Sequence, residues 1–348
     1  MPITVRSYAK INLGLRIGAR REDGFHELLT VYQTIGLHDE IRISVGRGSG
    51  IEIRCEDQNV PRDESNTCYR IVDKALSALG AKGQVVIEIG KRLPVQGGMG
   101  GASSNAVAAL LGLERVLRKR LTGEARLRIA AEVGSDLPLF LIGGTVLGVG
   151  RGEQVFPLVD LPAMACVMVT PEIGVSTPKA FAEWDRRMGV AETIEAVGAH
   201  GEGKPAGLRP AGQRRTALPA LTLLGPSDRM SELGRGLSAW LSESYSGAPL
   251  GKRGRRENPL LELVRAGIKN DFEEVVFPEY PELSEGKKAL ERVGAKYASL
   301  SGSGSALYGL FASNAAARLA AEKLRKQGWT AQATATITRR QYWQGVGR

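Results

Sequence analysis

Hydrophobic and polar residues alternate along residues 3–17, in the segment ITVRSYAKINLGLRI. A period of two predicts a β-strand with one buried face. Lys10 and Asn12 fall together on the opposite face, two residues apart, so we expect their side chains to be neighbours. The segment ARREDGF at 19–25 predicts a turn, and residues 26–46 predict further antiparallel strands.

Helical spacing follows in three segments of the first half. Residues 64–79 predict a helix that Ser65 or Asn66 can cap. Residues 84–94 predict a strand, and apolar residues between 102 and 117 recur at helical spacing. A further helix is predicted at 124–134. The apolar segment 137–150 contains glycines and predicts a pair of buried strands.

A new apolar block at 155–169 indicates a domain boundary, which divides the chain into domains 1–158 and 159–348. Residues 186–257 are rich in Gly, Pro, Ala and Arg, with weak periodicity apart from a short helical piece at 231–243. They predict a long, partly disordered insertion. Helices at 282–294 and 315–328, two strands within 295–313 and a terminal strand then predict a small α+β sandwich.

The formal net charge of +10 allows either a nucleic-acid-binding protein or an enzyme for anionic small molecules. Aromatic residues make up only 5% of the chain, and the basic residues are scattered apart from one cluster at 251–257. Nucleic-acid binding relies on a concentrated basic surface. The composition therefore favours the enzyme and no nucleic-acid partner.

Three features predict a cytoplasmic protein with no membrane partner. The first ten residues are polar and basic, without the apolar run of a secretory signal. No segment has the ~18 uninterrupted apolar residues of a membrane span. Cys55, Cys68 and Cys166 are far apart and odd in number, which is typical of reduced thiols and predicts no metal site.

Four glycines lie within residues 97–101, between a predicted strand and a predicted helix. The first amides of a helix lack partners, the helix dipole makes that end partly positive, and glycine leaves room for a ligand. This arrangement predicts a phosphate-binding loop. Tight packing alone is the alternative. The loop lacks the G-K-[ST] of a Walker A motif and the acidic residue of a Rossmann fingerprint.

Ser103 and Ser104 follow the glycines and predict either helix caps or ligands of a phosphate or its Mg²⁺. Lys10 and Asp136 are the candidate partners for phosphoryl transfer, which needs a cation and a proton acceptor. An exposed strand lysine and a capping aspartate are the alternatives for these two residues. The small-residue loop within 299–311 predicts either a hairpin or a second polyanion contact.

These motifs resemble those of the superfamily of galactokinase, homoserine kinase, mevalonate kinase and phosphomevalonate kinase. LPVQGGMGGASSNA is similar to its phosphate-binding motif, with Met99 in place of a leucine, and SLSGSGSALYGLF to its C-terminal glycine motif. Within the superfamily, A-K-I-N-L, R-x-D-G-F-H-E-L and G-S-D-L-P-L-F-L resemble the 4-diphosphocytidyl-2-C-methyl-D-erythritol kinases. The resemblance covers residues 3–185 and 258–311.

The resemblance implies an N-terminal domain like ribosomal protein S5 and a ferredoxin-like C-terminal sandwich, with the active site between them. It implies ATP and Mg²⁺ as cofactors and a CDP-linked sugar alcohol of the non-mevalonate isoprenoid pathway as the substrate. Asp136 would be the base and Lys10 would orient it. The implied nucleotide-binding residues are Asn66, Lys91, Pro94, Val95, Gln96, Gly97, Gly98, Met99, Gly100, Gly101, Ala102, Ser103 and Ser104.

The resemblance also implies substrate contacts by Asn12, Phe25, His26 and Phe181, the last three around cytosine. Phe25 stands where the family often has tyrosine, and Gly101-Ala102 where Gly-Gly or Ser-Ser is more usual. A sibling kinase for mevalonate, homoserine or a sugar and an RNA-binding relative without activity remain alternatives. We expect a monomer or a weak homodimer. The insertion has no counterpart in the family pattern.

Overall fold

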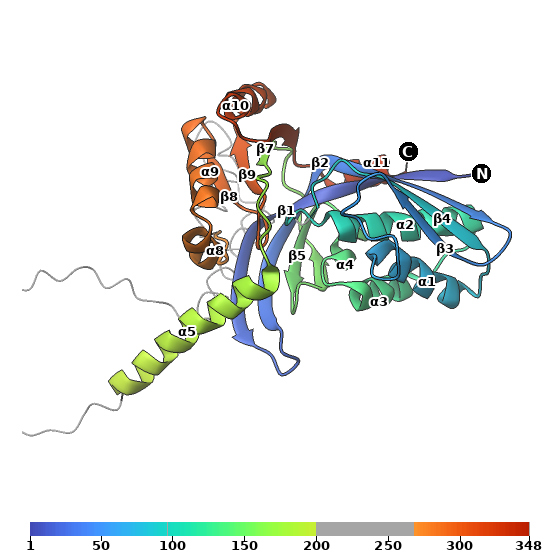
Figure 1. Ribbon diagram of the computed structural model, residues 1–348, viewed down its shortest axis with the longest axis horizontal. Helices are drawn as coiled ribbons and strands as arrows, with labels where there is room; N and C mark the ends of the chain where they lie inside the picture. The colour runs from blue at the N-terminus through green and yellow to red at the C-terminus, as the bar shows by residue number, and fades with distance from the viewer. Residues whose placement is uncertain (96, 200–267, 348) are drawn as a thin grey trace, which may run out of the picture.

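The computed structural model describes residues 1–95, 97–199 and 268–347, in two bodies built on separate sheets (Figure 1). The first sheet contains β1 (Ile3–Arg20), β2 (His26–Gly46), β3 (Gly50–Cys55), β4 (Gln84–Gly90), β5 (Thr145–Val149) and β6 (Gln154–Pro157). The second contains β7 (Ala165–Val169), β8 (Tyr297–Leu300), β9 (Leu307–Phe311) and β10 (Ala331–Ala335). The predicted α+β, two-domain fold is confirmed.

The first sheet is organised around β2. This strand pairs antiparallel with β1 along one edge, while β4 and β5 share its other edge. Residues 26–46 form one 21-residue strand rather than several. The shorter strands β4 and β5 each pair with a different half of it. β3 was absent from the sequence-based prediction and pairs in parallel with β4.

The first body includes the helices α1 (Thr67–Leu79), α2 (Gly101–Leu117), α3 (Gly123–Val133) and α4 (Leu137–Phe140). They lie together beside the sheet in Figure 1, with α2 packed on β1 and β2. Asn66 caps α1 by accepting from the amide of Cys68. The strand predicted at the start of 137–150 is wrong, since α4 is a buried helical turn and an apolar run is compatible with either structure.

The second body follows the order β7, helices, β8, β9, α10, β10, with its strands arranged β10-β7-β9-β8. This is the βαββαβ order of a ferredoxin-like sandwich. Its helices are α5 (Thr177–Ala199), α8 (Glu273–Glu279), α9 (Pro281–Arg292) and α10 (Asn314–Lys326). Residues 186–199 of the predicted insertion continue α5, and residues 200–257 lie outside the described residues.

The sequence-based prediction ended in a strand, but the chain continues into α11 (Arg339–Val346). Thr338 and Gln341 form a reciprocal capping box at its start, a signal that the sequence contains. Tyr342 and Val346 pack into the core of the first body, although they belong to the segment 159–348. The boundary at residue 158 stays a prediction.

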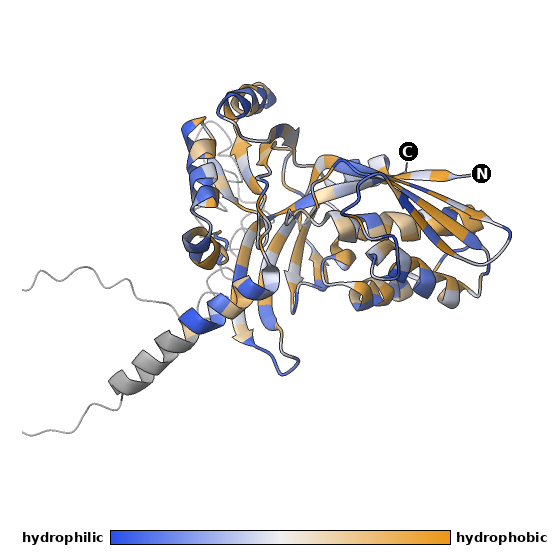
Figure 2. Ribbon diagram, viewed as in Figure 1, coloured by the Kyte–Doolittle hydropathy of each residue, from blue (hydrophilic) through white to orange (hydrophobic). Residues whose placement is uncertain are grey.

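The prediction of one buried face for β1 is wrong, because both faces are buried from Ser7 to Ile17. The strand crosses from the first body to the second: Val5 lies in the first hydrophobic core, while Leu15 and Ile17 lie in the second. Figure 2 shows hydrophilic residues at the tip of the β1–β2 hairpin and along α10. The polar residues in the middle of β1 therefore lie inside the molecule.

Candidate active site

Lys10 and Asp136 meet where β1 passes the glycine loop. Lys10 is 2% exposed, and its Nζ lies 3.5 Å from Oδ2 of Asp136. The same ammonium donates to Oδ1 of Asn12 at 2.7 Å and to the carbonyl oxygen of Gly98 at 2.9 Å. The predicted proximity of Lys10 and Asn12 is confirmed, and Lys10 is not an exposed strand lysine.

Asp136 immediately precedes α4 but does not cap it, since its side chain makes no capping hydrogen bond. About a third of that side chain is exposed, so the carboxylate remains accessible to a ligand. Its second oxygen accepts a hydrogen bond from the hydroxyl of Tyr32 at 3.1 Å. Asp136 is therefore held between a cation and a phenol.

The sequence analysis missed Tyr32. Its ring centroid lies 5.7 Å from the Lys10 ammonium, and Tyr32 opposes Asn12 in the β1–β2 register. Burial, reinforced by the negative charge of Asp136, raises the pKa of Tyr32 well above its ordinary value. The phenol therefore stays protonated and acts as a donor. The hairpin register that brings it to the site depends on bulges, so no signal in the sequence identified it.

The carbonyl groups of the glycine loop point toward the protein. The Gly97 carbonyl accepts from the amide of Ala306, the Gly98 carbonyl from Lys10 Nζ, and the Met99 carbonyl from the Lys10 amide. In a trans peptide, C=O and the following N–H point in opposite directions. The amides of residues 98, 99 and 100 thus point away from these partners, and none of them donates a hydrogen bond within the described part of the chain. Such a set of amides is suited to bind a phosphate.

Packing also explains two of the glycines, as the alternative interpretation of the loop proposed. Gly98 has φ +70°, and a Cβ there would collide with the carbonyl oxygens of Ser301 and Gly304. At Gly100, φ +68°, a Cβ would meet the ring of Phe140 at 2.9 Å. The second small-residue loop therefore packs directly on the first. Both packing and amide orientation require these glycines.

We expect Gly98→Ala to lower the free energy of unfolding by about 2–4 kcal/mol, because it adds both positive-φ strain and a backbone clash. Urea unfolding would measure the change. Gly123→Ala is the matched control, since that glycine begins α3 and a Cβ there meets nothing within 4 Å. Equal stability of the two variants would contradict the close contact between the loops.

Most of the predicted nucleotide-binding residues line one cavity of about 370 Å³. These are Asn66, Lys91, Pro94, Val95, Gly97, Gly98, Met99, Gly100, Gly101, Ala102 and Ser103. Ser104 is separate from them, because its hydroxyl is buried against the hydroxyl of Ser7 at 2.6 Å. Gln96 lies outside the described residues.

Lys91 enters this cavity from the end of β4 and is held by Asp39, a second residue that the sequence analysis missed. Asp39 is fully buried, and its Oδ2 lies 2.7 Å from Lys91 Nζ. Its Oδ1 accepts from the amides of Arg92 and Leu93. One carboxylate thus fixes both the lysine and the backbone that leads into the glycine loop.

The residues predicted around cytosine lie at the hairpin end of the molecule. His26 is 6% exposed, and its ring stacks on Phe181 with centroids 4.8 Å apart and planes 6° apart. Phe25 is 52% exposed and lies under the guanidinium of Arg151, 5.0 Å from its ring centroid. Phe181 therefore contacts His26 directly, while Phe25 is available to a ligand.

Two family models match the chain. One, described as GHMP kinases N terminal domain, covers residues 66–144, and the other, GHMP kinases C terminal, covers residues 255–328. A 4-diphosphocytidyl-2-C-methyl-D-erythritol kinase of Solibacter usitatus is 34% identical over 307 residues, which cover 88% of this chain and 80% of the relative. The chain belongs to the 4-diphosphocytidyl-2-C-methyl-D-erythritol kinase family.

A second member of this kinase family, from Geobacter sp. (strain M21), is 31% identical over 330 residues, which cover 94% of this chain and 97% of the relative. A crystal structure of 4-(cytidine 5'-diphospho)-2C-methyl-D-erythritol kinase superposes with a TM-score of 0.67 at 28% identity, over 96% of this chain and 99% of that one. L. major mevalonate kinase, at 14% identity and a TM-score of 0.65, shows the fold alone. Membership in a kinase family implies ATP as the phosphoryl donor.

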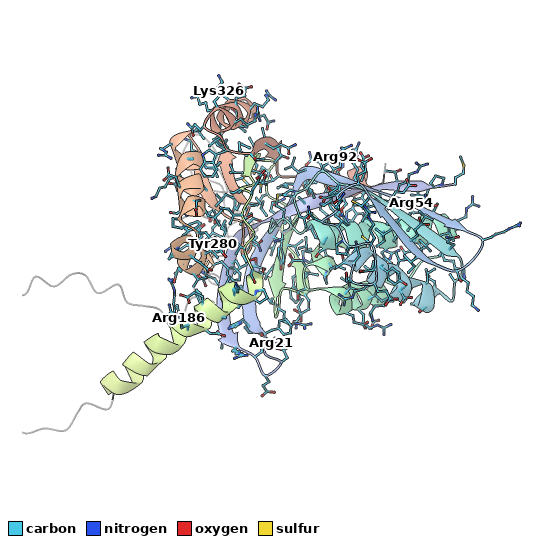
Figure 3. All side chains as sticks on the ribbon, viewed as in Figure 1. Arg21, Arg54, Arg92, Arg186, Tyr280 and Lys326 are labelled. Atoms are coloured by element: carbon cyan, nitrogen blue, oxygen red, sulfur yellow. The ribbon has the colours of Figure 1, made fainter. Side chains whose placement is uncertain are left out.

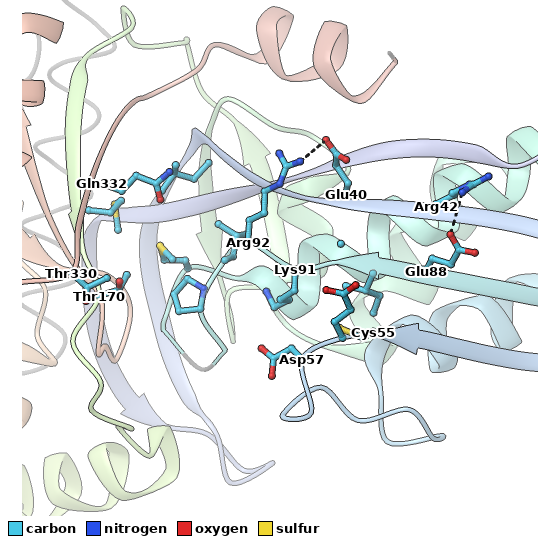
Figure 4. Close-up of a pocket in the computed structure, with 18 of the residues that line it drawn as sticks. Glu40, Arg42, Cys55, Asp57, Glu88, Lys91, Arg92, Thr170, Thr330 and Gln332 are labelled. Atoms are coloured by element: carbon cyan, nitrogen blue, oxygen red, sulfur yellow. Dashed lines mark ion pairs between the residues drawn. The ribbon is translucent and has the colours of Figure 1, made fainter.

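The cavity at the glycine loop has a larger neighbour, a groove of about 1310 Å³ lined by residues of both sheets. Figure 4 shows its ion pairs, Arg92 with Glu40 and Arg42 with Glu88. The groove includes Lys91 but neither Lys10 nor Asp136. It is therefore adjacent to the cavity at the glycine loop and separate from Lys10 and Asp136.

Metal clusters and membrane-spanning helices are both absent from residues 1–95, 97–199 and 268–347. No group of three or more His, Cys, Asp or Glu residues there has the arrangement of a metal site. No helix there combines the length and hydrophobicity needed to cross a bilayer. The three cysteines are unpaired thiols, and burial raises the pKa of the Cys68 thiol to about 12.

Proposed function

We propose that the protein transfers the γ-phosphoryl group of ATP to a hydroxyl of 4-diphosphocytidyl-2-C-methyl-D-erythritol. The names of the family members support this substrate. The single observation that carries the proposal within this chain is the ion pair of Lys10 with Asp136, placed directly behind the glycine loop. It brings a cation and a proton acceptor to the point where a phosphate would be held.

In the proposed reaction, the substrate hydroxyl oxygen attacks the γ-phosphorus as its proton passes to Asp136. The bond between the γ-phosphorus and the oxygen that bridges it to the β-phosphate breaks, and ADP leaves with that oxygen. Lys10 holds Asp136 and compensates the negative charge that develops. Tyr32 orients the carboxylate through its hydrogen bond. The loop amides of residues 98–100 bind phosphate oxygens.

We include Mg²⁺ in the proposal as the metal of the ATP complex. Mg²⁺ in kinases is held largely by phosphates and water with one or two protein oxygens, so a dedicated cluster of carboxylates is not required. Ser103 lines the cavity, whereas Ser104 is bound to Ser7, so Ser103 is the hydroxyl suited to this role. The metal would neutralise charge on the transferring phosphates.

For the substrate, we propose that Phe25 stacks on cytosine and that His26 and Phe181 complete its pocket. Asn12 would contact the substrate beside Lys10. Its amide is already oriented, because it accepts from Lys10 and donates to Thr30. We further propose a cytoplasmic monomer or weak homodimer without a nucleic-acid partner, with domains 1–158 and 159–348.

The test is ATP consumption by the purified protein with Mg²⁺ and each of four acceptors: 4-diphosphocytidyl-2-C-methyl-D-erythritol, mevalonate, homoserine and galactose. We expect turnover with the cytidine compound alone, because the exposed Phe25 ring next to the stacked His26 and Phe181 is suited to stack on a base. Turnover with another acceptor would retain the phosphate site and reject the cytosine pocket. No turnover with any acceptor would reject the kinase assignment.

A further inference from the structure

Helix α5 holds the His26 ring through two side chains one turn apart. Phe181 stacks on the face of the imidazole, and Oδ1 of Asp185 lies 2.5 Å from its Nε2. Residues four apart lie on the same side of a helix. Figures 1 and 3 show α5 beside the β1–β2 hairpin, with Arg186 labelled on the helix and Arg21 near the hairpin tip. One face of α5 therefore contacts both the flat face and one edge of the His26 ring.

The helix itself is firmly anchored at this point. Trp184, between the two contact residues, is 1% exposed and belongs to the second core. Phe181 also packs against Phe272, with centroids 4.9 Å apart and planes at 72°. The hydroxyl of Thr177, at the start of α5, hydrogen-bonds that of Ser303. The contact of Asp185 with His26 is thus part of a packed interface.

The chemistry of the two groups determines where a neutral His26 carries its proton. An ionised carboxylate only accepts hydrogen bonds, so the proton of a neutral imidazole must be on Nε2. The other nitrogen, Nδ1, is then an acceptor. Nδ1 makes no hydrogen bond with the residues that the structure describes, and this atom is not fully buried. It is therefore accessible to a ligand.

We propose that Asp185 is a specificity-positioning residue, which holds His26 in the tautomer whose Nδ1 accepts a hydrogen bond and thereby selects a base that carries an amino group. Cytosine presents such a donor at N4, whereas uracil presents a carbonyl oxygen at the same place. Nδ1 and the uracil carbonyl oxygen are both acceptors, so neither would gain a hydrogen bond. In a buried site such unpaired groups strongly disfavour binding of uracil. This inference rests on the proposed function for the identity of the ligand.

The first test compares steady-state kinetics for the cytidine substrate and its uridine counterpart. Asn has both a donor and an acceptor, so Asp185→Asn no longer determines the tautomer. We expect the KM for the cytidine substrate to rise about tenfold. Discrimination against the uridine compound should fall, with kcat and the KM for ATP nearly unchanged. Asp185→Glu retains an acceptor and should recover most of the discrimination.

Glu183→Gln is the matched control, because it removes one negative charge from the same helix. Its carboxylate pairs with Arg186 and Arg187 rather than with His26. We expect this variant to keep the wild-type discrimination. A loss equal to that of Asp185→Asn would mean that charge or helix stability, and not the contact with His26, sets the preference, and the inference would fall.

The second test needs no turnover. The chain contains three histidines, so ¹⁵N labelling of their rings and an assignment with His26→Gln are practical. We expect the neutral wild-type ring to carry its proton on Nε2 and Asp185→Asn to shift this tautomer equilibrium. A wild-type ring protonated on Nδ1 would overturn the inference. Failure of the cytidine compound as a substrate, with the expected tautomer present, would instead reject the proposed function.

Discussion

Asp136→Asn is expected to reduce kcat by about 10³–10⁴-fold, since a general base typically contributes 10²–10⁴-fold and an amide cannot take its place. Asn is isosteric and still accepts from Tyr32, so the site should keep its shape. The carboxylate does not line the cavity proposed for the nucleotide, so ATP binding should remain close to wild type. Stopped reactions for turnover and calorimetry for ATP binding measure the two effects separately.

Asp160→Asn provides a control for the removal of a partly buried aspartate outside the candidate site. Its carboxylate accepts from the amides of Thr145 and Arg339, away from Lys10. We expect this change to affect stability more than kcat. If Asp136→Asn abolished ATP binding, or retained wild-type kcat, Asp136 would not be the base.

Lys10→Met is expected to reduce kcat by about 10²–10³-fold, the cost of removing one donor that stabilises transition-state charge. Methionine has a similar length, so it fills the buried space of the Lys10 side chain without the ammonium. The fold should survive, because Asp136 is partly exposed and the Gly98 carbonyl still accepts from the hydroxyl of Ser301. Thermal unfolding checks the fold, and single-turnover kinetics check the chemical step.

The matched control is Lys74→Met, which removes an exposed lysine paired with Glu132 on the surface. Exposed pairs contribute little to stability, so this variant should behave as wild type. Wild-type single-turnover rates in Lys10→Met would show that Lys10 has only a packing role. Loss of folding in Lys10→Met would be detected in the melting curve and separated from a loss of chemistry.

The order of local elements was predictable because it depends on short-range patterns. Strand, glycine loop and helix follow one another at residues 84–117 as the periodicity predicts. The βαβ and hairpin elements of the second body follow as well. One error occurred where the pattern was ambiguous. The apolar run at 137–140 fits a buried strand and a buried helical turn equally well.

The candidate site was only partly predictable, for the same reason. Lys10, Asp136 and the glycines carry their own sequence signals, and the family resemblance assigned roles to them. Tyr32, Asp39 and Asp185 carry no such signal, because each contacts a residue distant in the chain. Their roles depend on hairpin register, on a buried carboxylate between strands, and on the docking of α5.

By itself, the sequence determined the strand, glycine loop and helix at residues 84–117 and the family to which the chain belongs. Those properties follow from periodicity, glycine content and residue identity, which are local. Only the tertiary structure decided that both faces of β1 are buried, so that Lys10 lies inside beside Asp136. It also decided that Gly98 must accommodate the carbonyl of Ser301, about two hundred residues away in the sequence. Packing between distant segments determines burial and contact, and no local pattern contains that information.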